Sequence, residues 1–203
     1  MTLTTHPPRA QLPRKISPSS RTITVTSAVG SGVTGMSAFD AALDSAGIGN
    51  FNLVQLSSVI PAGSSIDDLD GAAVTVDGEW GDRLYIVMAK AVVEEFGDEA
   101  WAGIGWVQQE DSRKGLFVEH SSPTKSYLQS ELMNSLGSMC ERRGEDFESI
   151  HYHLRGTICV GQPVCAVVVA IFEPQAWVSE WAPPAGLQAR SLAGPGGQQS
   201  QRQ

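Results

Sequence analysis

The sequence predicts an α+β layered fold in a single domain. Two segments have the apolar periodicity of amphipathic helices, and the other apolar segments are short or alternate with polar residues, as strands do. Because an amphipathic helix must bury its apolar stripe, we expect each helix to pack on a sheet face. A chain of 203 residues is long enough for one domain with a substantial core and too short for two typical ones.

The N-terminal region contains an arm, a strand and a turn. Residues 1–20 are rich in Pro, Thr, Ser and Arg, and we predict that they form a disordered arm. Residues 22–26 alternate polar with apolar side chains, which predicts the first strand. A glycine-rich turn is expected next, at Gly30, Gly32 and Gly35.

The first helix is predicted over residues 37–46. Ser37 is a suitable N-cap and Gly47 a suitable C-terminal stop. The residues that share its apolar face are Phe39, Ala42, Leu43 and Ala46.

The middle of the chain is predicted to be mostly strands. Residues 52–56 form a strand that leads directly into Ser57 and Ser58, and residues 61–71 form a loop. Residues 84–93 are nearly continuously apolar, with β-branched and aromatic members, which favours a buried strand although a helix is compatible. The other apolar runs are 73–76, 101–107 and 116–119.

The last part of the domain contains a long helix followed by two strands. Residues 125–143 have 3.6-residue spacing, and Gly144 ends the helix. The apolar positions of this helix are Leu128, Leu132, Met133, Leu136, Met139 and Cys140. Strands are expected at 149–159 and 163–173, and residues 185–203 are predicted to be a disordered tail. The domain therefore spans residues 21–184.

Composition and charge exclude several classes of function. The formal net charge is −8 and the pI is about 4.9, so binding to a nucleic-acid backbone is not expected. No run of residues is apolar enough for a membrane span. Three cysteines without metal-type spacing favour reduced thiols in a cytoplasmic protein. His151 and His153 alternate on a predicted strand without a third ligand, so we expect no metal site.

The serine pair lies in a distinctive stretch of sequence. The segments SAFDAAL (37–43), AGIGN (46–50) and NLVQLSSVIP (52–61) together resemble the pyruvoyl-dependent arginine decarboxylases. A weaker resemblance continues through GLFVE (115–119) and in the order of elements as far as Glu173. The chain departs from the family pattern at Ala62, where a second proline is common.

The resemblance implies both an architecture and an activity. The expected fold is a four-layer αββα sandwich, assembled as a homotrimer with active sites between neighbouring protomers. Cleavage between Ser57 and Ser58 is expected to convert Ser58 into a covalent pyruvoyl cofactor. The enzyme would then decarboxylate L-arginine to agmatine and CO2 through a Schiff base on that group.

The chemistry of cleavage makes its own structural demands. The Ser58 hydroxyl attacks the carbonyl carbon of Ser57, which is unfavourable unless the scissile peptide is strained. A hydrogen-bond donor should face the developing oxyanion. Asn52 is the candidate for that donor, or for positioning the substrate.

The resemblance also implies roles for individual residues, each with an ordinary structural alternative. Glu119 matches the family's proton donor, whereas a solvated carboxylate at a strand end is the alternative. Asp40 matches the aspartate that binds the guanidinium group, but it could instead complete a capping box with Ser37. Leu43 and Val59 match residues that line the aliphatic stem of the substrate, or they belong to the core.

Two other functions stay open at the level of sequence. The same chemistry could act on another amino acid, such as histidine. Alternatively, the chain could be a non-catalytic homologue that binds a metabolite, in which Ser58 persists as an ordinary serine.

Overall fold

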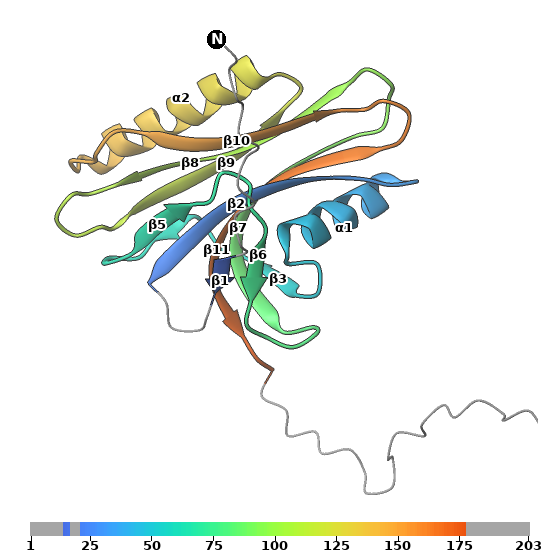
Figure 1. Ribbon diagram of the computed structural model, residues 1–203. Helices are drawn as coiled ribbons and strands as arrows, with labels where there is room; N and C mark the ends of the chain where they lie inside the picture. The colour runs from blue at the N-terminus through green and yellow to red at the C-terminus, as the bar shows by residue number, and fades with distance from the viewer. Residues whose placement is uncertain (1–13, 17–20, 178–203) are drawn as a thin grey trace, which may run out of the picture.

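A computed structural model of the chain describes residues 14–16 and 21–177 (Figure 1). Two helices and eleven strands are present in these ranges. The helices are α1 (Gly35–Ala46) and α2 (Lys125–Arg143). The strands are β1 (Arg14–Ile16), β2 (Thr22–Ser31), β3 (Asn52–Gln55), β4 (Val59–Ile60), β5 (Ser65–Asp68), β6 (Val74–Val76), β7 (Arg83–Val93), β8 (Glu99–Gln108), β9 (Gly115–Ser122), β10 (His151–Ile158) and β11 (Val164–Gln175).

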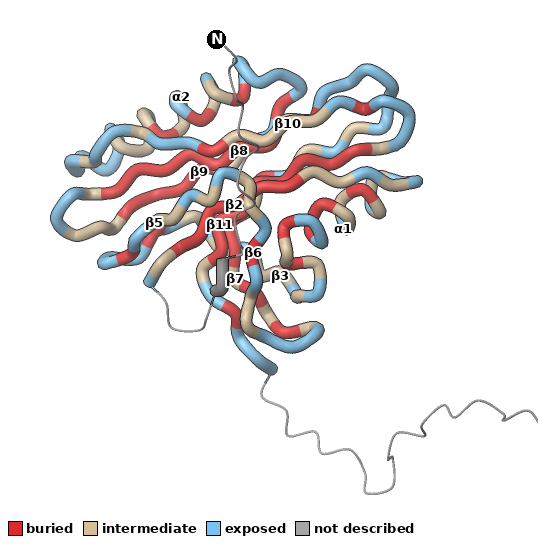
Figure 2. Tube along the Cα trace, viewed as in Figure 1, coloured by how far each residue is buried: buried red, intermediate tan, exposed pale blue. Residues whose placement is uncertain are grey.

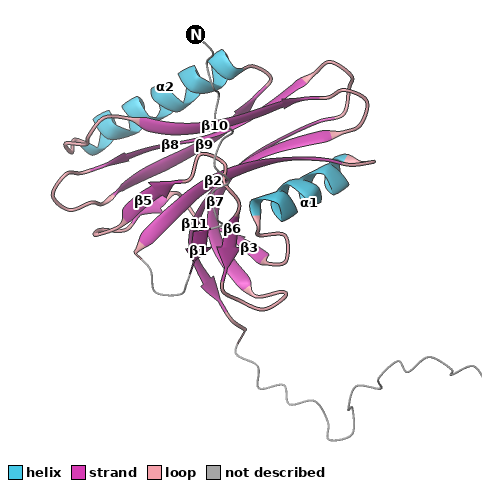
Figure 3. Ribbon diagram, in the orientation of Figure 1, coloured by secondary structure: helices cyan, strands magenta, loops and turns pink. Residues whose placement is uncertain are grey.

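Two larger sheets make up the body of the protein (Figure 3). The five-stranded sheet has the order β3-β7-β11-β2-β5, and the four-stranded sheet has the order β10-β8-β9-β4. The long central strands are antiparallel, whereas the short edge strands β3 and β5 pair in parallel with β7 and β2. A two-stranded sheet joins β1 to β6 in parallel.

The apolar side chains form three clusters. One lies between α1 and the five-stranded sheet, one between the two sheets, and one between the four-stranded sheet and α2. Figure 2 shows the buried segments along the central strands and at intervals along the two helices. The prediction of an α+β fold in a single domain, with each helix packed on a sheet, is therefore confirmed. No helix in the described parts of the chain has the length and apolar character needed to cross a membrane.

Helix α1 begins two residues earlier than predicted. Its N-cap is Thr34, whose side chain accepts a hydrogen bond from the Ser37 backbone N–H, while the Ser37 hydroxyl accepts one from the Thr34 N–H. The prediction of Ser37 as the N-cap is wrong because Ser37 is the third helical residue of this capping box. Asp40 consequently lies beyond the first turn and takes no part in capping.

The glycine-rich turn is also misplaced, because β2 continues through Gly30 to Ser31. A Cβ atom at Gly30 would lie 2.3 Å from the Ala42 backbone nitrogen and 2.4 Å from the Ala38 carbonyl oxygen. This glycine therefore allows α1 to lie directly against the strand, and it is not needed for a turn.

The predicted loop over residues 61–71 contains a strand, β5, so that prediction is wrong in part. Its residues, Ser-Ile-Asp-Asp, lack the alternation of a half-buried strand. The pairing with β2 supplies backbone partners that local sequence cannot reveal. By contrast, residues 84–93 form a strand and residues 125–143 form a helix, both as predicted.

The predicted arm and tail are only partly described. Strand β1 lies inside the segment predicted as the arm, residues 1–20. The rest of that arm, apart from β1, and the tail at 185–203 lie outside the described residues.

Candidate active site

Ser58 lies where the chain passes from one sheet to the other. Strand β3 ends on the five-stranded sheet at Gln55, and β4 begins at Val59 on the edge of the four-stranded sheet. Strand β4 pairs with β9, and the Ser58 carbonyl accepts a hydrogen bond of 2.8 Å from the Phe117 backbone N–H. These contacts fix the serine pair beside β9.

Glu119 contacts the Ser58 side chain. It lies two positions beyond Phe117 on β9, so both side chains point to the same face of the strand. Phe117 belongs to the core between the sheets, and Glu119 therefore faces the other sheet. The Ser58 Oγ donates to the Glu119 carboxylate, at 2.8 Å from Oε2 and 3.0 Å from Oε1. A carboxylate in this position can accept the hydroxyl proton.

The Ser58 backbone is strained. Its φ angle of 67° lies in the left-handed region, which only three non-glycine residues of the described chain adopt. A non-glycine residue held in this region costs about 1–3 kcal/mol and persists only where surrounding contacts enforce it. Here the enforcing contacts are the Phe117 and Glu119 hydrogen bonds. The scissile bond predicted from sequence thus joins an exposed Ser57 to a strained Ser58.

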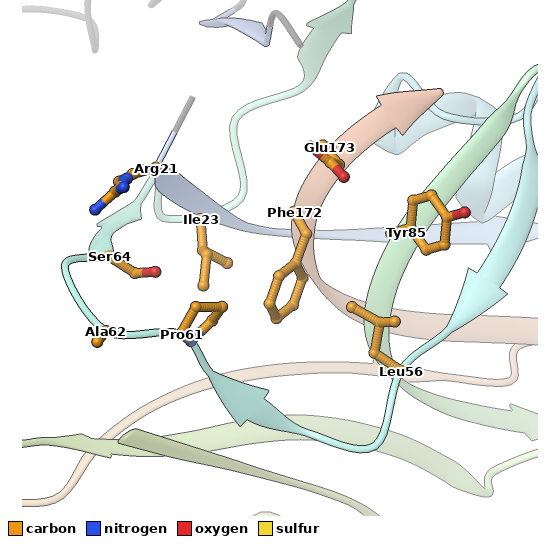
Figure 4. Close-up of a pocket in the computed structure, with 9 residues that line it drawn as sticks. All are labelled: Arg21, Ile23, Leu56, Pro61, Ala62, Ser64, Tyr85, Phe172 and Glu173. Atoms are coloured by element: carbon orange, nitrogen blue, oxygen red, sulfur yellow. The ribbon is translucent and has the colours of Figure 1, made fainter. Parts of the chain in front are cut away.

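A pocket of about 410 Å³ opens beside this segment (Figure 4). Leu56 and Pro61, which flank the serine pair, form part of its wall. The residues that line it are Arg21, Ile23, Leu56, Pro61, Ala62, Ser64, Tyr85, Phe172 and Glu173. Ser58 is not among the lining residues, so the pocket lies next to the serine loop and not over the hydroxyl.

A β-bulge turns an acidic residue toward this pocket. The register of β11 against β7 shifts between Ile171 and Glu173, where Ile171 pairs with Ile86 and Glu173 pairs with Tyr85. A bulge of this kind brings consecutive side chains to one face of the strand. Phe172 and Glu173 consequently both line the pocket. Its wall is largely apolar, and the charged residues that line it are Glu173 and Arg21.

Asn52 lies at the opposite end of β3 from the serines. Its side-chain amide donates to the Gly81 carbonyl, and its backbone N–H donates to the Asp82 carbonyl at 2.7 Å. Because a strand rises about 3.3 Å per residue, Asn52 is about 13 Å from Leu56 along the chain. The described chain by itself therefore does not bring Asn52 to Ser58.

The three residues predicted to bind substrate lie in different environments. Asp40 is exposed on α1, and Leu43 is buried between α1 and the five-stranded sheet. That face of the sheet is opposite the one that faces Glu119. Val59 follows Ser58 directly and is 56% exposed. One chain thus unites Ser57, Ser58, Val59 and Glu119, and it leaves Asp40, Leu43 and Asn52 apart from them.

A buried polar network that the sequence did not reveal connects the two sheets. The ring of His153 makes hydrogen bonds to Asp68 Oδ1 at 2.7 Å and to Ser27 Oγ at 2.8 Å. Burial of the Asp68 carboxyl opposes its ionisation and by itself would raise its pKa. Hydrogen bonds from His153 and from the Asp70 N–H, together with the charge of His153, outweigh burial and lower the pKa of Asp68 below 3.8. Ser27 is 2% exposed, so its hydroxyl is not accessible to a substrate. This Ser–His–Asp arrangement has a structural role.

Of the two strand histidines, His153 is 7% exposed and makes a hydrogen bond through each ring nitrogen. The sequence did not indicate the role of Asp68, because this residue lies in the segment predicted as a loop. No group of three or more His, Cys, Asp or Glu residues able to hold a metal ion occurs within residues 14–16 and 21–177.

Comparison with known proteins identifies related sequences over most of the domain. A family model described as pyruvoyl-dependent arginine decarboxylase matches residues 22–176. A protein of that name from Halobacterium salinarum is 40% identical over 97 residues, which cover 47% of this chain and 58% of the relative. Another from Methanothermobacter thermautotrophicus is 30% identical over 63% of this chain and 81% of the relative. A third from Pyrococcus furiosus is 32% identical over 72% of this chain and 91% of the relative.

Proposed function

This chain belongs to the pyruvoyl-dependent arginine decarboxylase family, and from that premise we propose that it is a self-processing enzyme that converts L-arginine to agmatine and CO2. Its cofactor would be a pyruvoyl group made from Ser58. The observation that carries the proposal is the hydrogen bond from a strained Ser58 to Glu119, at 2.8 Å. A serine with this backbone and this acceptor is prepared for attack on the preceding carbonyl.

Cleavage would begin with transfer of the Ser58 hydroxyl proton to Glu119. The Ser58 oxygen then attacks the carbonyl carbon of Ser57, and the amide C–N bond breaks as the nitrogen takes up a proton, which leaves an ester. Loss of the Ser58 Cα proton breaks the bond between Cβ and the ester oxygen. This releases the Ser57 carboxylate and leaves dehydroalanine. Water then replaces the nitrogen, which leaves as ammonia, and the new N-terminus carries a ketone.

Glu119 would act again in the decarboxylation. A pyruvoyl group at position 58 would supply an electron-withdrawing carbonyl able to condense with the substrate α-amine and to accept the electrons released with CO2. Glu119, which already lies against Ser58, would deliver a proton to the carbon that has lost CO2. Val59 would contact the aliphatic stem of the substrate beside it.

We further propose that the active form is a homotrimer with each site between two protomers. Asp40 and Leu43 lie with α1 on the far side of the five-stranded sheet from Glu119, away from Ser58 of the same chain, which supports a site completed by another copy. Asn52 is likewise apart from Ser58 of its own chain, and it would donate a hydrogen bond to the oxyanion or to the substrate. The packing of α1, two sheets and α2 supports the four-layer αββα sandwich.

Free thiols at all three cysteines, Cys140, Cys159 and Cys165, support a cytoplasmic location.

Reductive trapping tests the proposed function. Incubation with L-arginine and cyanoborohydride should attach the substrate covalently to the N-terminus of the fragment that begins at position 58. The Ser58→Ala variant should stay intact and form no adduct. Decarboxylation of arginine by an uncut chain that traps no substrate would contradict the proposal, because the reaction would then not use a carbonyl derived from Ser58.

A further inference from the structure

The Gly81 carbonyl accepts hydrogen bonds from two side chains that lie far apart in the sequence. One donor is Asn52 Nδ2, and the other is Trp177 Nε1 at 2.8 Å. Gly81 has a φ of 87°, a conformation suited to glycine, which allows the turn before β7 to present this carbonyl. The two donors thus occupy both acceptor sites of one carbonyl oxygen.

Further contacts attach the end of β11 to the same turn. The Trp177 backbone N–H donates to Asp82 Oδ1 at 3.2 Å, and Arg83 Nη2 donates to the Ala176 carbonyl at 3.0 Å. The Arg83 guanidinium carbon lies 4.5 Å from the centre of the Trp177 ring, within the range of a cation–π contact. Trp177 is therefore held by its backbone, its indole N–H and its ring face.

These contacts bear directly on the Asn52 side chain. A terminal amide can rotate to exchange its oxygen and nitrogen, and an acceptor on one side selects the nitrogen. One Nδ2 hydrogen of Asn52 is bonded to the Gly81 carbonyl, so the other Nδ2 hydrogen can donate to a second acceptor. The backbone N–H of Asn52 donates to Asp82, and that of Gly81 donates to the Asn50 carbonyl. These hydrogen bonds join the turn at Gly81 and Asp82 to the start of β3. Trp177 contacts this turn at the Gly81 carbonyl, which also orients the Asn52 side chain.

We propose that Trp177 is a positioning residue that holds the Gly81 carbonyl, and through it Asn52, in the orientation required for self-cleavage. The proposal rests on the proposed function, and within it on the alternative in which Asn52 of one copy donates to the oxyanion at the cleavage site of its neighbour. The family match ends at residue 176, so Trp177 lies immediately beyond the part of the chain shared with the family. Trp177, two residues after the end of β11, would therefore influence processing in this protein.

The first test compares two tryptophans on the full-length chain. Trp177→Phe keeps an aromatic ring over Arg83 and removes only the N–H donor. Because one hydrogen bond is lost, cleavage of freshly translated chain should slow by about 5- to 10-fold. Trp80→Phe is the matched control, since Trp80 is 83% exposed, and it should cleave at the wild-type rate. Trp177 is itself 57% exposed, so the midpoint of thermal unfolding should change little in either variant. Equal cleavage rates for Trp177→Phe and the wild type would overturn the proposal.

A double-mutant cycle separates positioning from general weakening of the structure. In an Asn52→Ala background, Trp177→Phe should cause little additional slowing, because the group that it positions is absent. The same 5- to 10-fold slowing in both backgrounds would overturn the proposal. Wild-type cleavage by Asn52→Ala alone would instead remove Asn52 from the proposed function, and with it the basis of this inference.

Discussion

At the scale of residues, the main feature is a contact between two side chains that are 61 positions apart. Ser58 is strained by its positive φ and is bound on one side by a β9 backbone amide and on the other by Glu119. In the proposed cleavage, the strain would raise the energy of the uncut chain and the Glu119 carboxylate would accept the Ser58 proton. The contribution of Glu119 to the rate of cleavage can be measured by replacing that residue alone.

Replacement of Glu119 by glutamine should slow self-cleavage by about 10²–10⁴-fold, the usual contribution of a positioned general base. The amide keeps the shape of the side chain but cannot accept the Ser58 proton. The measurement is the fraction of cut chain against time on a denaturing gel. Glu110→Gln, on an exposed loop residue, should cleave like the wild type. Unimpaired cleavage by Glu119→Gln would exclude its role as the base.

Substrate specificity can be assigned by comparing two carboxylates. If Asp40 of a neighbouring protomer binds the guanidinium group, Asp40→Asn should raise the KM for arginine by about 10- to 100-fold, because a charge-assisted hydrogen bond is lost. Glu173→Gln, in the pocket beside the serine loop, should then leave KM unchanged. The reverse pattern in steady-state kinetics would assign the guanidinium group to Glu173. A normal KM for arginine in both variants would favour another amino acid as the substrate.

The sequence could predict only part of the candidate site. It suggested Ser58, Glu119 and Val59, which the fold brings together because β4 pairs with β9. It could not predict the distance of Asn52 or Asp40 from Ser58, since the paths of β3 and α1 depend on sheet pairing. The Ser27–His153–Asp68 network was missed for the same reason, because its members come from three strands.

At the scale of elements, helices and strands with strong local sequence patterns were predicted correctly, whereas those with weak patterns were not. Helix α2 and strand β7 have long apolar patterns, and both occur as predicted. Strand β5 has only four residues, three of them polar, and it forms because β2 offers an unpaired edge. The start of α1 was misplaced because Thr34 and Ser37 are both good capping residues, and only the geometry distinguishes them.

The contact of α1 with β2 gives a prediction about stability. Gly30→Ala should destabilise the fold by about 1–3 kcal/mol, since the new Cβ would collide with the α1 backbone and force the helix outward. Gly137→Ala is the matched control in α2, where a Cβ meets nothing within 4 Å. That change should stabilise the protein by about 0.5–1 kcal/mol. Chemical denaturation measures both, and equal effects of the two substitutions would contradict the packing.

At the scale of the whole molecule, the two sheets are joined mainly by apolar contacts, to which the His153 network adds a polar connection. His153 on β10 reaches Asp68 on β5 and Ser27 on β2. It therefore links the four-stranded sheet to the edge of the five-stranded sheet. An edge strand with little apolar surface gains most from such a contact.

The lowered pKa of Asp68 makes this connection dependent on pH. A carboxyl whose pKa is lower in the folded state stabilises the protein above its unfolded value, here 3.8, and loses that effect as pH falls through the folded pKa. Asp68→Asn should therefore lower stability at pH 7 by at most about 1 kcal/mol, since the side chain is 36% exposed and partly screened.

The difference between Asp68→Asn and the wild type should shrink below pH 3.8. Unfolding midpoints across this range provide the measurement. Asp98→Asn, at an exposed position, should show no such trend. A difference that is constant with pH would exclude an ionised Asp68 from the connection.

The intact mass of the purified protein tests self-cleavage before Ser58. If the bond breaks, a chain of 21.6 kDa gives two species, one of them residues 1–57 at about 6 kDa. The larger species should begin at position 58 and lack a free α-amine, because ammonia is lost as the ketone forms. A single species of 21.6 kDa that still releases CO2 from arginine would contradict a pyruvoyl cofactor made by cleavage at Ser58.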